Sequence, residues 1–361
     1  MQGLSITEVE IPDSVDADNA ADFLACVEVR STVWAHDSGS ADEVRPADEM
    51  LPVWRKQEHE PKRMLLARLD GRPVARAITE YRAGDTSDTA WLHVEVVPEA
   101  RGRGIGAELA GLAEALGREV GATKFIVYAP CWKVGGPRLA APTGFGDVAA
   151  DTAETRLLQR MGYRLEQVER GSRLPLPVAR EVIDAMRADA ERASEGEYRI
   201  HSWTGMTPVH WREDMAQLIT RMSIDAPSAG LEEEEDVWTV ERLIADETIT
   251  AEGPSTEFTT VVEHVPSGRL AGFTTLIAPD DMSRPIDQDD TIVLREHRGH
   301  RLGMLLKVAN IAYVQDARPG HPRIVTYNAE ENRHMLSVNE ALGFEPFVYE
   351  GAWRKDVVGE V

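Results

Sequence analysis

The pattern of apolar and polar residues changes its period within one short stretch of the chain. The run from Trp91 to Val97 is rich in apolar and β-branched residues and predicts a strand. Pro98 ends it, because proline has no N–H for the ladder. The segment 101–106 then reads Arg-Gly-Arg-Gly-Ile-Gly. After it, apolar residues recur with the 3.6-residue period of a helix, at Ile105, Leu109, Leu112, Ala113 and Leu116. The pattern thus predicts a strand, a glycine-rich turn and a helix in direct succession.

This turn has the features of an anion-binding site. Glycine lets the backbone approach a ligand closely, and the first N–H groups of a helix have no partner inside it. With the positive end of the helix dipole they attract a phosphate, and Arg101 and Arg103 add positive charge. The spacing of Gly102, Gly104 and Ala107 also fits a dinucleotide-binding turn. That alternative is disfavoured, because Pro-Glu-Ala-Arg separates the strand from the first glycine and no acidic residue ends the next strand.

The rest of the first half shows the same two periods. Strands are predicted at 6–11, 64–70, 73–81, 124–128 and 164–169, and helices at 18–30 and 151–161. Asp70-Gly71-Arg72 is a hairpin signal. Residues 31–61 are predicted to be irregular, and the Gly- and Pro-rich segment 131–150 to be a long loop.

The same order of elements returns in the second half. Strands are predicted at 198–203, 258–264, 270–278, 287–294, 323–328 and 347–349, and helices at 209–222, from 302 onward and at 332–342. The turn Arg298-Gly299-His300-Arg301-Leu302-Gly303 again stands between a strand and a helix, and Gly162-Tyr163 has its counterpart in Gly343-Phe344. Such an internal repeat indicates two similar domains. We place them at 1–170 and 198–361, joined by a linker at 171–197 that contains a helix.

The key stretch resembles the acyl-CoA-binding signature of the GNAT superfamily of N-acyltransferases. The match runs through Val96, Val97 and Pro98 to the Arg-x-x-Gly-x-Gly pattern of residues 101–106. Two such domains in tandem, as in mycothiol synthase, would cover nearly the whole chain. The resemblance implies an α/β fold in which each domain is a mixed twisted sheet flanked by helices. It also implies acetyl-CoA as co-substrate, with the pantetheine arm along the backbone of Val96 and Val97. The implied CoA residues of the first domain are Val96, Val97, Arg101, Gly102, Arg103, Gly104, Ile105 and Gly106.

The second domain departs from this pattern, because Arg301 stands where the middle glycine is expected. A side chain there occupies space that the phosphate would need, although its charge partly compensates. The weaker second site implied by the resemblance comprises Val293, Arg298, Gly299, His300, Arg301, Leu302, Gly303 and Asn332.

Acyl transfer to an amine needs a base for the amine and a proton or a donor for the leaving thiolate. His93 and Glu95 lie on the key strand, and Asp287 and Asp290 lie on the matching strand of the second domain. By resemblance, residues 31–61 cover the acceptor site. The tyrosine that serves as acid in many family members is replaced by Leu158 and Asn339. The open alternatives are that the thiolate leaves without an acid, that one domain has lost activity, or that another tyrosine serves, namely Tyr128, Tyr163 or Tyr327. Our candidate catalytic residues are Glu95, His93, Asp290 and Asn339.

Composition narrows the possible partners. The net charge of −23 argues against nucleic acid and is compatible with a cationic amine substrate. Cys26 and Cys131 are the two cysteines, which argues against a disulfide framework or a cysteine zinc site, and we predict no metal. The sequence shows neither a long apolar run nor a secretory signal, so we expect no membrane contact and a cytoplasmic protein. We expect a monomer or homodimer that acetylates a small-molecule amine; the rival interpretation is a CoA-binding sensor or scaffold without turnover.

Overall fold

The computed structural model describes residues 2–84, 88–132, 135–194, 196–225, 227–232 and 234–357. The chain forms two compact units. The first unit comprises Met1–Val168, Ala229–Leu231 and Tyr349–Val361, and the second comprises Glu169–Ser228 and Glu232–Val348. The sequence-based boundaries differ from this division, because residues 171–197 belong to the second unit and the C-terminal residues belong to the first.

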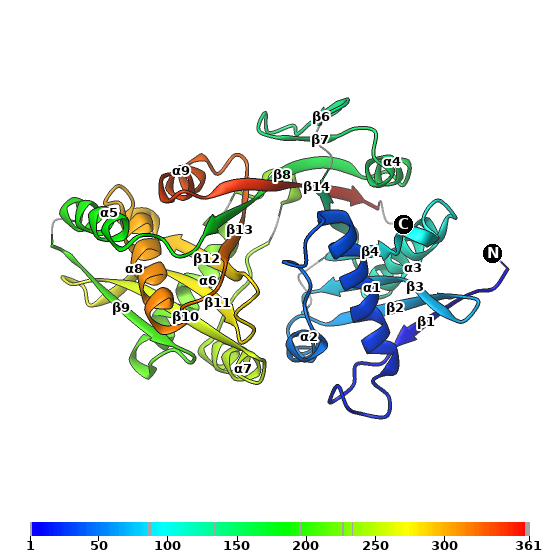
Figure 1. The fold of residues 1–361 in the computed structure, drawn as a ribbon, viewed down its shortest axis with the longest axis horizontal. Coiled ribbons are helices and arrows are strands. Elements are labelled where there is room, and N and C mark those ends of the chain that lie inside the picture. The colour runs from blue at the N-terminus through cyan, green and yellow to red at the C-terminus, as the bar shows by residue number, and fades with distance from the viewer. Residues whose placement is uncertain are drawn as a thin grey trace. The chain divides into compact units, whose positions relative to one another are not determined.

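The first unit is a mixed sheet with helices on both faces (Figure 1). Its strands are, in spatial order, β1 (Leu4–Val9), β2 (Lys62–Leu69), β3 (Arg72–Tyr81), β4 (Thr89–Val96), β5 (Lys124–Cys131) and part of β14 (Glu345–Asp356). All neighbours are antiparallel except the parallel pair β4–β5. Its helices are α1 (Ala21–Ser38), α2 (Ala47–Trp54), α3 (Ile105–Glu119) and α4 (Ala153–Arg160).

Strand alternation gives the first unit two separate cores. Ile78 of β3 packs with Phe23 of α1 and Met50 of α2 on one face. Leu92 of β4 packs with Ile105 and other residues of α3 on the opposite face. Successive side chains of a strand point to opposite faces, so His93 and Glu95 lie on the α1 face and Val94 and Val96 on the α3 face.

The second unit repeats this plan. Its strand order is part of β8 (Arg164–Pro175), β13 (Arg323–Ala329), β12 (Ile286–Val293), β11 (Arg269–Pro279), β10 (Ser255–His264) and β9 (Tyr198–Thr204). The parallel pair is β12–β13. Its helices are α5 (Arg180–Ala193), α6 (Arg212–Asp225), α7 (Val240–Thr250), α8 (Leu302–Ala317) and α9 (Arg333–Leu342). Helix α8 is buried almost all round, since the sheet covers one side and α5 packs with it.

Both final strands run beyond the residues predicted for them, 164–169 and 347–349. Tyr349–Asp356 of β14 pairs with β5 of the first unit, and Glu169–Pro175 of β8 pairs with β13 of the second. The last strand of the chain thus completes the sheet of the first unit, and residues 169–175 complete that of the second.

Two local predictions were wrong. Residues 31–61 contain the end of α1 and all of α2. Apart from Lys133 and Val134, which lie outside the described residues, segment 131–150 forms the end of β5 and a hairpin of β6 (Arg138–Ala140) and β7 (Asp147–Ala149).

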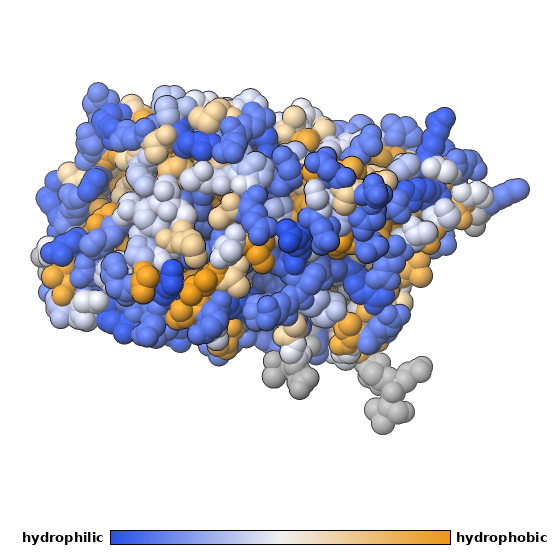
Figure 2. Space-filling model, turned by 90° about the horizontal axis from the view of Figure 1, so that it is seen from below, coloured by the Kyte–Doolittle hydropathy of each residue, from blue (hydrophilic) through white to orange (hydrophobic). Residues whose placement is uncertain are grey.

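The face shown in Figure 2 is mostly hydrophilic, with apolar residues in small groups. Among helices of the described residues, none is long and apolar enough to cross a membrane.

Candidate active site

The parallel strands of each unit separate soon after they begin to pair. In the described residues, β4 and β5 pair over Thr89–Trp91 and Lys124–Ile126. Val97 N–H donates to Val74 O at 2.9 Å, on the β3 side. Because backbone groups alternate between the two edges of a strand, the N–H groups of Val94 and Val96 face the opening. This edge offers hydrogen bonds to an extended ligand. Val97 was predicted to contribute as well, but its N–H is already bonded.

The glycine-rich turn lies at the end of this opening. Gly102 and Gly104 have φ of 73° and 83°, and a Cβ on either would meet no atom within 4 Å. Gly104 is the N-cap of α3, and no described side chain caps that helix. The first N–H groups of α3 are therefore available to an anion. Ile105, by contrast, is 1% exposed, so that its side chain belongs to the core and its backbone alone faces the turn.

Arg101 fixes the turn from within. Its Nε donates to Val96 O at 2.9 Å, and its two terminal nitrogens donate to the carboxylate of Asp37, at the end of α1, at 2.9 and 2.7 Å. The hydrogen bonds that Arg101 donates to Asp37 raise the pKa of Arg101. Arg101 was predicted to anchor a phosphate, whereas its guanidinium is hydrogen-bonded to Asp37. Arg103 is exposed and donates to Glu99 O at 3.2 Å, so its charge faces the surroundings of the turn.

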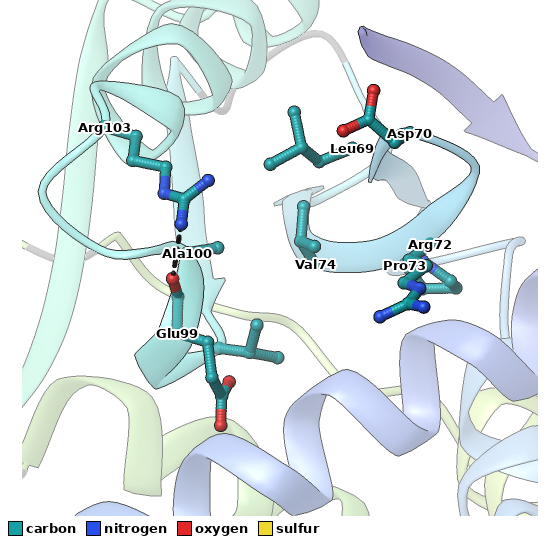
Figure 3. A pocket seen from close by; sticks show the side chains of 9 residues that line it. Leu69, Asp70, Arg72, Pro73, Val74, Glu99, Ala100 and Arg103 are labelled. Carbon is teal, nitrogen blue, oxygen red and sulfur yellow. Dashed lines mark hydrogen bonds between the residues drawn. The ribbon is translucent and has the colours of Figure 1, made fainter.

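A cavity of about 600 Å³ lies beside the turn (Figure 3). It is formed by the β2–β3 turn and the segment after β4, and Arg103 lies at its edge. The lining residues are Leu69, Asp70, Arg72, Pro73, Val74, Val97, Glu99, Ala100 and Arg103. Charges of both signs line it, so it does not favour one class of ligand.

The second turn keeps the same backbone in spite of Arg301. Arg301 is the N-cap of α8 with φ of 55°, and Gly299 has φ of 93°. Arg298 repeats the contacts of Arg101, because its Nε donates to Val293 O at 3.1 Å and its Nη2 donates to Asp225, at the end of α6, at 3.1 Å. The other predicted residues differ in placement. Leu302 is buried in the core, His300 packs beside Tyr198, Gly303 has open space around it, and Asn332 caps α9 by accepting from Met335 N–H at 3.3 Å.

Glu95 is held by a cation that the sequence analysis missed. Arg76, directly opposite on β3, donates to both carboxylate oxygens at 2.8 and 2.9 Å, and Trp34 Nε1 of α1 donates at 3.4 Å. Burial opposes ionisation of Glu95, but Arg76 outweighs it and lowers the pKa. Glu95 is therefore a carboxylate at neutral pH and a poor proton acceptor. The strand register would have revealed this pair.

His93 lies on the same face as Glu95. Burial lowers its pKa, so that its imidazole is neutral at pH 7, but the same burial weakens it as a proton acceptor. The aromatic rings of Trp34 and Trp132 meet edge to face on this side, with centroids 6.4 Å apart.

The residues considered as the acid for the leaving thiolate differ in their surroundings. Leu158 is buried in the core on the α3 face. The Tyr163 hydroxyl donates to Glu114 at 3.0 Å, and burial raises the pKa of this tyrosine. Tyr327 packs edge to face on Phe347. Tyr128 of β5 lies two residues beyond Ile126, the last residue that pairs with β4, and packs against the same cluster as Trp91; Tyr327 lies two residues beyond Val325, the last β13 residue that pairs with β12.

Asn339 and Asp290 have different surroundings in the second unit. Asn339 is 1% exposed and donates to Asn328 Oδ1 at 2.7 Å, while its own Oδ1 has no partner among the described residues. Burial raises the pKa of Asp290 to about 8, and Asp289 and Glu257 add to the effect. The described residues contain no group of three or more His, Cys, Asp or Glu placed to hold a metal ion.

Comparison with known proteins agrees with this geometry. Residues 31–133 match the model of the Acetyltransferase (GNAT) family. The fold is similar to a tandem GNAT protein from the clavulanic acid biosynthesis pathway, with a TM-score of 0.72 and 22% identity, over 99% of this chain and 100% of that one. It is also similar to a GCN5-related N-acetyltransferase from Sphaerobacter thermophilus, with a TM-score of 0.63 and 15% identity, over 100% and 98%. No curated protein sequence matches. Residues 31–133 therefore match the GNAT family by sequence, and the whole chain has the fold of a tandem GNAT protein.

Proposed function

We propose that this protein transfers the acetyl group of acetyl-CoA to a primary amine of a small molecule, with acetyl-CoA bound in the first unit. One observation carries the proposal. The opening between β4 and β5 leads directly to the uncapped N-terminus of α3, where two left-handed glycines expose the backbone. An extended thiol arm and a pyrophosphate would fit this combination of strand edge and helix end.

The residues of the first unit would then share the chemistry as follows. The N–H of Val94 or Val96 polarises the thioester carbonyl. The amine nitrogen attacks the carbonyl carbon, the C–N bond forms, and the C–S bond breaks to release the thiolate of CoA. His93 takes the proton that the amine loses, directly or through water. Glu95, held by Arg76, keeps a fixed negative charge near the developing imidazolium.

The test is a pair of substitutions at Gly104. Gly104→Glu and Gly104→Gln carry the same left-handed strain of about 1–2 kcal/mol. Both side chains have room, since no atom lies within 4 Å of the added Cβ, and Arg301 shows that a side chain is accepted at this helix end. They differ in charge alone. We expect calorimetry to show acetyl-CoA binding weakened by more than about tenfold in Gly104→Glu relative to Gly104→Gln.

The stoichiometry of the same titration shows which of the two units binds acetyl-CoA. One site per chain that is lost in Gly104→Glu supports the first unit as the CoA unit. Two sites would show that the second turn binds as well. Equal affinity of wild type and both variants would refute the assignment, and absence of any binding would refute the acetyltransferase proposal.

A second candidate function is CoA binding without turnover. It is favoured by the absence of the usual acid, because Leu158 replaces the tyrosine and the Tyr163 hydroxyl is bound to Glu114. Release of free thiol from acetyl-CoA, measured across a panel of amines, separates the two. Binding without thiol release for every amine would favour this candidate. A cytoplasmic location and a monomeric or dimeric state remain predictions.

A further inference from the structure

Three residues from the second half of the chain are part of the first unit. Ala229–Leu231, in the connection between α6 and α7, belongs to the first unit, although the chain on either side of it belongs to the second. The three residues form a single helical turn. Leu231 is 0% exposed and packs with Ile126 of β5 and Ala352 of β14. The first unit therefore buries a side chain that the first half of the chain does not supply.

This turn is held firmly in place. Arg354 of β14 donates to Gly230 O at 2.6 Å. Gly230 also lies close to Glu166 of β8, because a Cβ at this position would collide with the Glu166 carboxylate. Ala229 and Glu232 have φ of 45° and 52°, in the left-handed region that residues other than glycine rarely adopt. Such a backbone persists only where surrounding contacts enforce it, and strained positions of this kind cluster at functional sites.

Leu231 lies on the face of the sheet that carries His93. Its cluster includes Trp91 of β4 and Tyr128 of β5, and Trp91 pairs with Ile126. Trp91 precedes His93 by two residues, so their side chains point to the same side of the sheet, about 7 Å apart along the strand. On this face α1 and α2 pack with β1, β2 and β3, whereas Leu231 packs on β5 and β14. Leu231 therefore covers one end of the face from which an amine would approach His93.

We propose that Leu231 closes one end of the acceptor site of the first unit and thereby limits the length of the amine. The inference rests on the proposed acetyl transfer, in which the amine lies beside His93. Trp91 and Tyr128 are partly exposed and would contact the carbon chain of the amine, while Leu231 fills the space behind them. Leu231 is thus a positioning residue that acts through these two rings.

The length of the amine is the property that Leu231 would control. Removal of its side chain leaves an apolar cavity behind Trp91 and Tyr128, and such a cavity stays dry and accepts an apolar group. A longer carbon chain could then enter it. If Leu231 only stabilised the fold, its loss would lower the rates for all amines alike, so a change in length preference separates the two roles.

The test measures kcat/KM of the intact protein for straight-chain amines from ethylamine to octylamine, by release of free thiol from acetyl-CoA. Leu231→Ala should accept amines about one or two methylene groups longer than wild type does. The first amine that wild type rejects should gain about tenfold in kcat/KM. Leu231→Phe should shift the limit to shorter amines, because the larger side chain pushes the two rings towards the amine. The control is Leu218→Ala, the same change at a leucine of α6 that is 1% exposed in the second unit, and it should leave the length limit unchanged.

Acetyl-CoA affinity, measured by calorimetry, should be the same in wild type and all three variants, which shows that the first unit is folded. If Leu231→Ala loses this affinity, Leu231→Val tests the same direction with a smaller cavity. An unchanged length limit in both Leu231 variants, or an equal loss of activity for every amine, would overturn the role of Leu231 alone. Wild type that acetylates other amines but none of this series would also overturn it. If wild type binds acetyl-CoA but acetylates no amine at all, the proposed acetyl transfer fails, and this inference fails with it.

Discussion

A buried lysine in the second unit provides the sharpest test of the electrostatic reasoning. Lys307 of α8 is 1% exposed, and its Nζ lies 5.7 Å from the centre of the Phe344 ring. Its ammonium group forms no hydrogen bond or ion pair with the residues described. Burial therefore lowers its pKa from 10.5 to about 7. We expect Lys307→Met to stabilise the protein.

The size and sign of the effect follow from this shift. The folded protein prefers the neutral amine, while the unfolded chain is protonated up to about pH 10.5. The cost of Lys307 is therefore complete below about pH 7 and fades as the pH rises towards 10.5. A difference of about 3.5 pKa units corresponds to roughly 5 kcal/mol. Attraction to the Phe344 ring offsets about 1–2 kcal/mol, so we expect a gain of about 3–4 kcal/mol at pH 7.

Chemical denaturation at pH 7 and at pH 10 measures this gain. Hydrogen exchange of α8 assigns the change to the second unit, because the two units need not unfold together. Lys355→Met is the matched control. Lys355 lies 2.8 Å from both carboxylate oxygens of Glu114, so its loss should destabilise the first unit at pH 7. If Lys307→Met were no more stable than wild type at pH 7, the ammonium group would have a stabilising partner and the reasoning would be refuted.

Two further predictions concern residues that support the site. Asp37→Asn removes the ionic partner of Arg101 and loosens the turn. The affinity for acetyl-CoA, measured by calorimetry, should fall about fivefold, the equivalent of about 1 kcal/mol. Asp225→Asn, the same change in the second unit, should leave acetyl-CoA binding in the first unit unaffected. Tyr163→Phe should leave the pH profile of acetylation unchanged, because the hydroxyl donates to Glu114 and Phe344 stands at the corresponding position of the second unit. Loss of this hydrogen bond should lower the free energy of unfolding by about 1–2 kcal/mol. A shifted pH profile would restore Tyr163 as a candidate acid.

The sequence was most informative where structure depends on neighbouring residues. The strand before Pro98, the turn at 101–106 and helix α3 were predicted nearly as they are found. Glycine spacing and helical period are local properties, which a single sequence displays. The repeat also showed that Arg298 corresponds to Arg101, and both indeed make the same backbone contact.

Charged residues were harder to interpret, because their partners lie far away in the chain. Arg101 and Asp37 are 64 residues apart, and Arg76 and Glu95 are 19 apart on facing strands. From the sequence alone, Arg101 is a free charge and Glu95 a free base. The fold pairs both of them, and we therefore propose Arg103 as the phosphate-binding cation and His93 as the base.

The sequence by itself determined the class of fold, the tandem repeat and the position of the glycine-rich turn, since each depends on short-range pattern or on comparison of one half with the other. The tertiary structure alone decided which strand closes each sheet, since Tyr349–Asp356 could pair with either sheet as far as its own residues show. It also decided that the pKa of Asp290 is raised to about 8 while that of Glu95 is lowered, because burial and pairing arise only when distant segments are brought together.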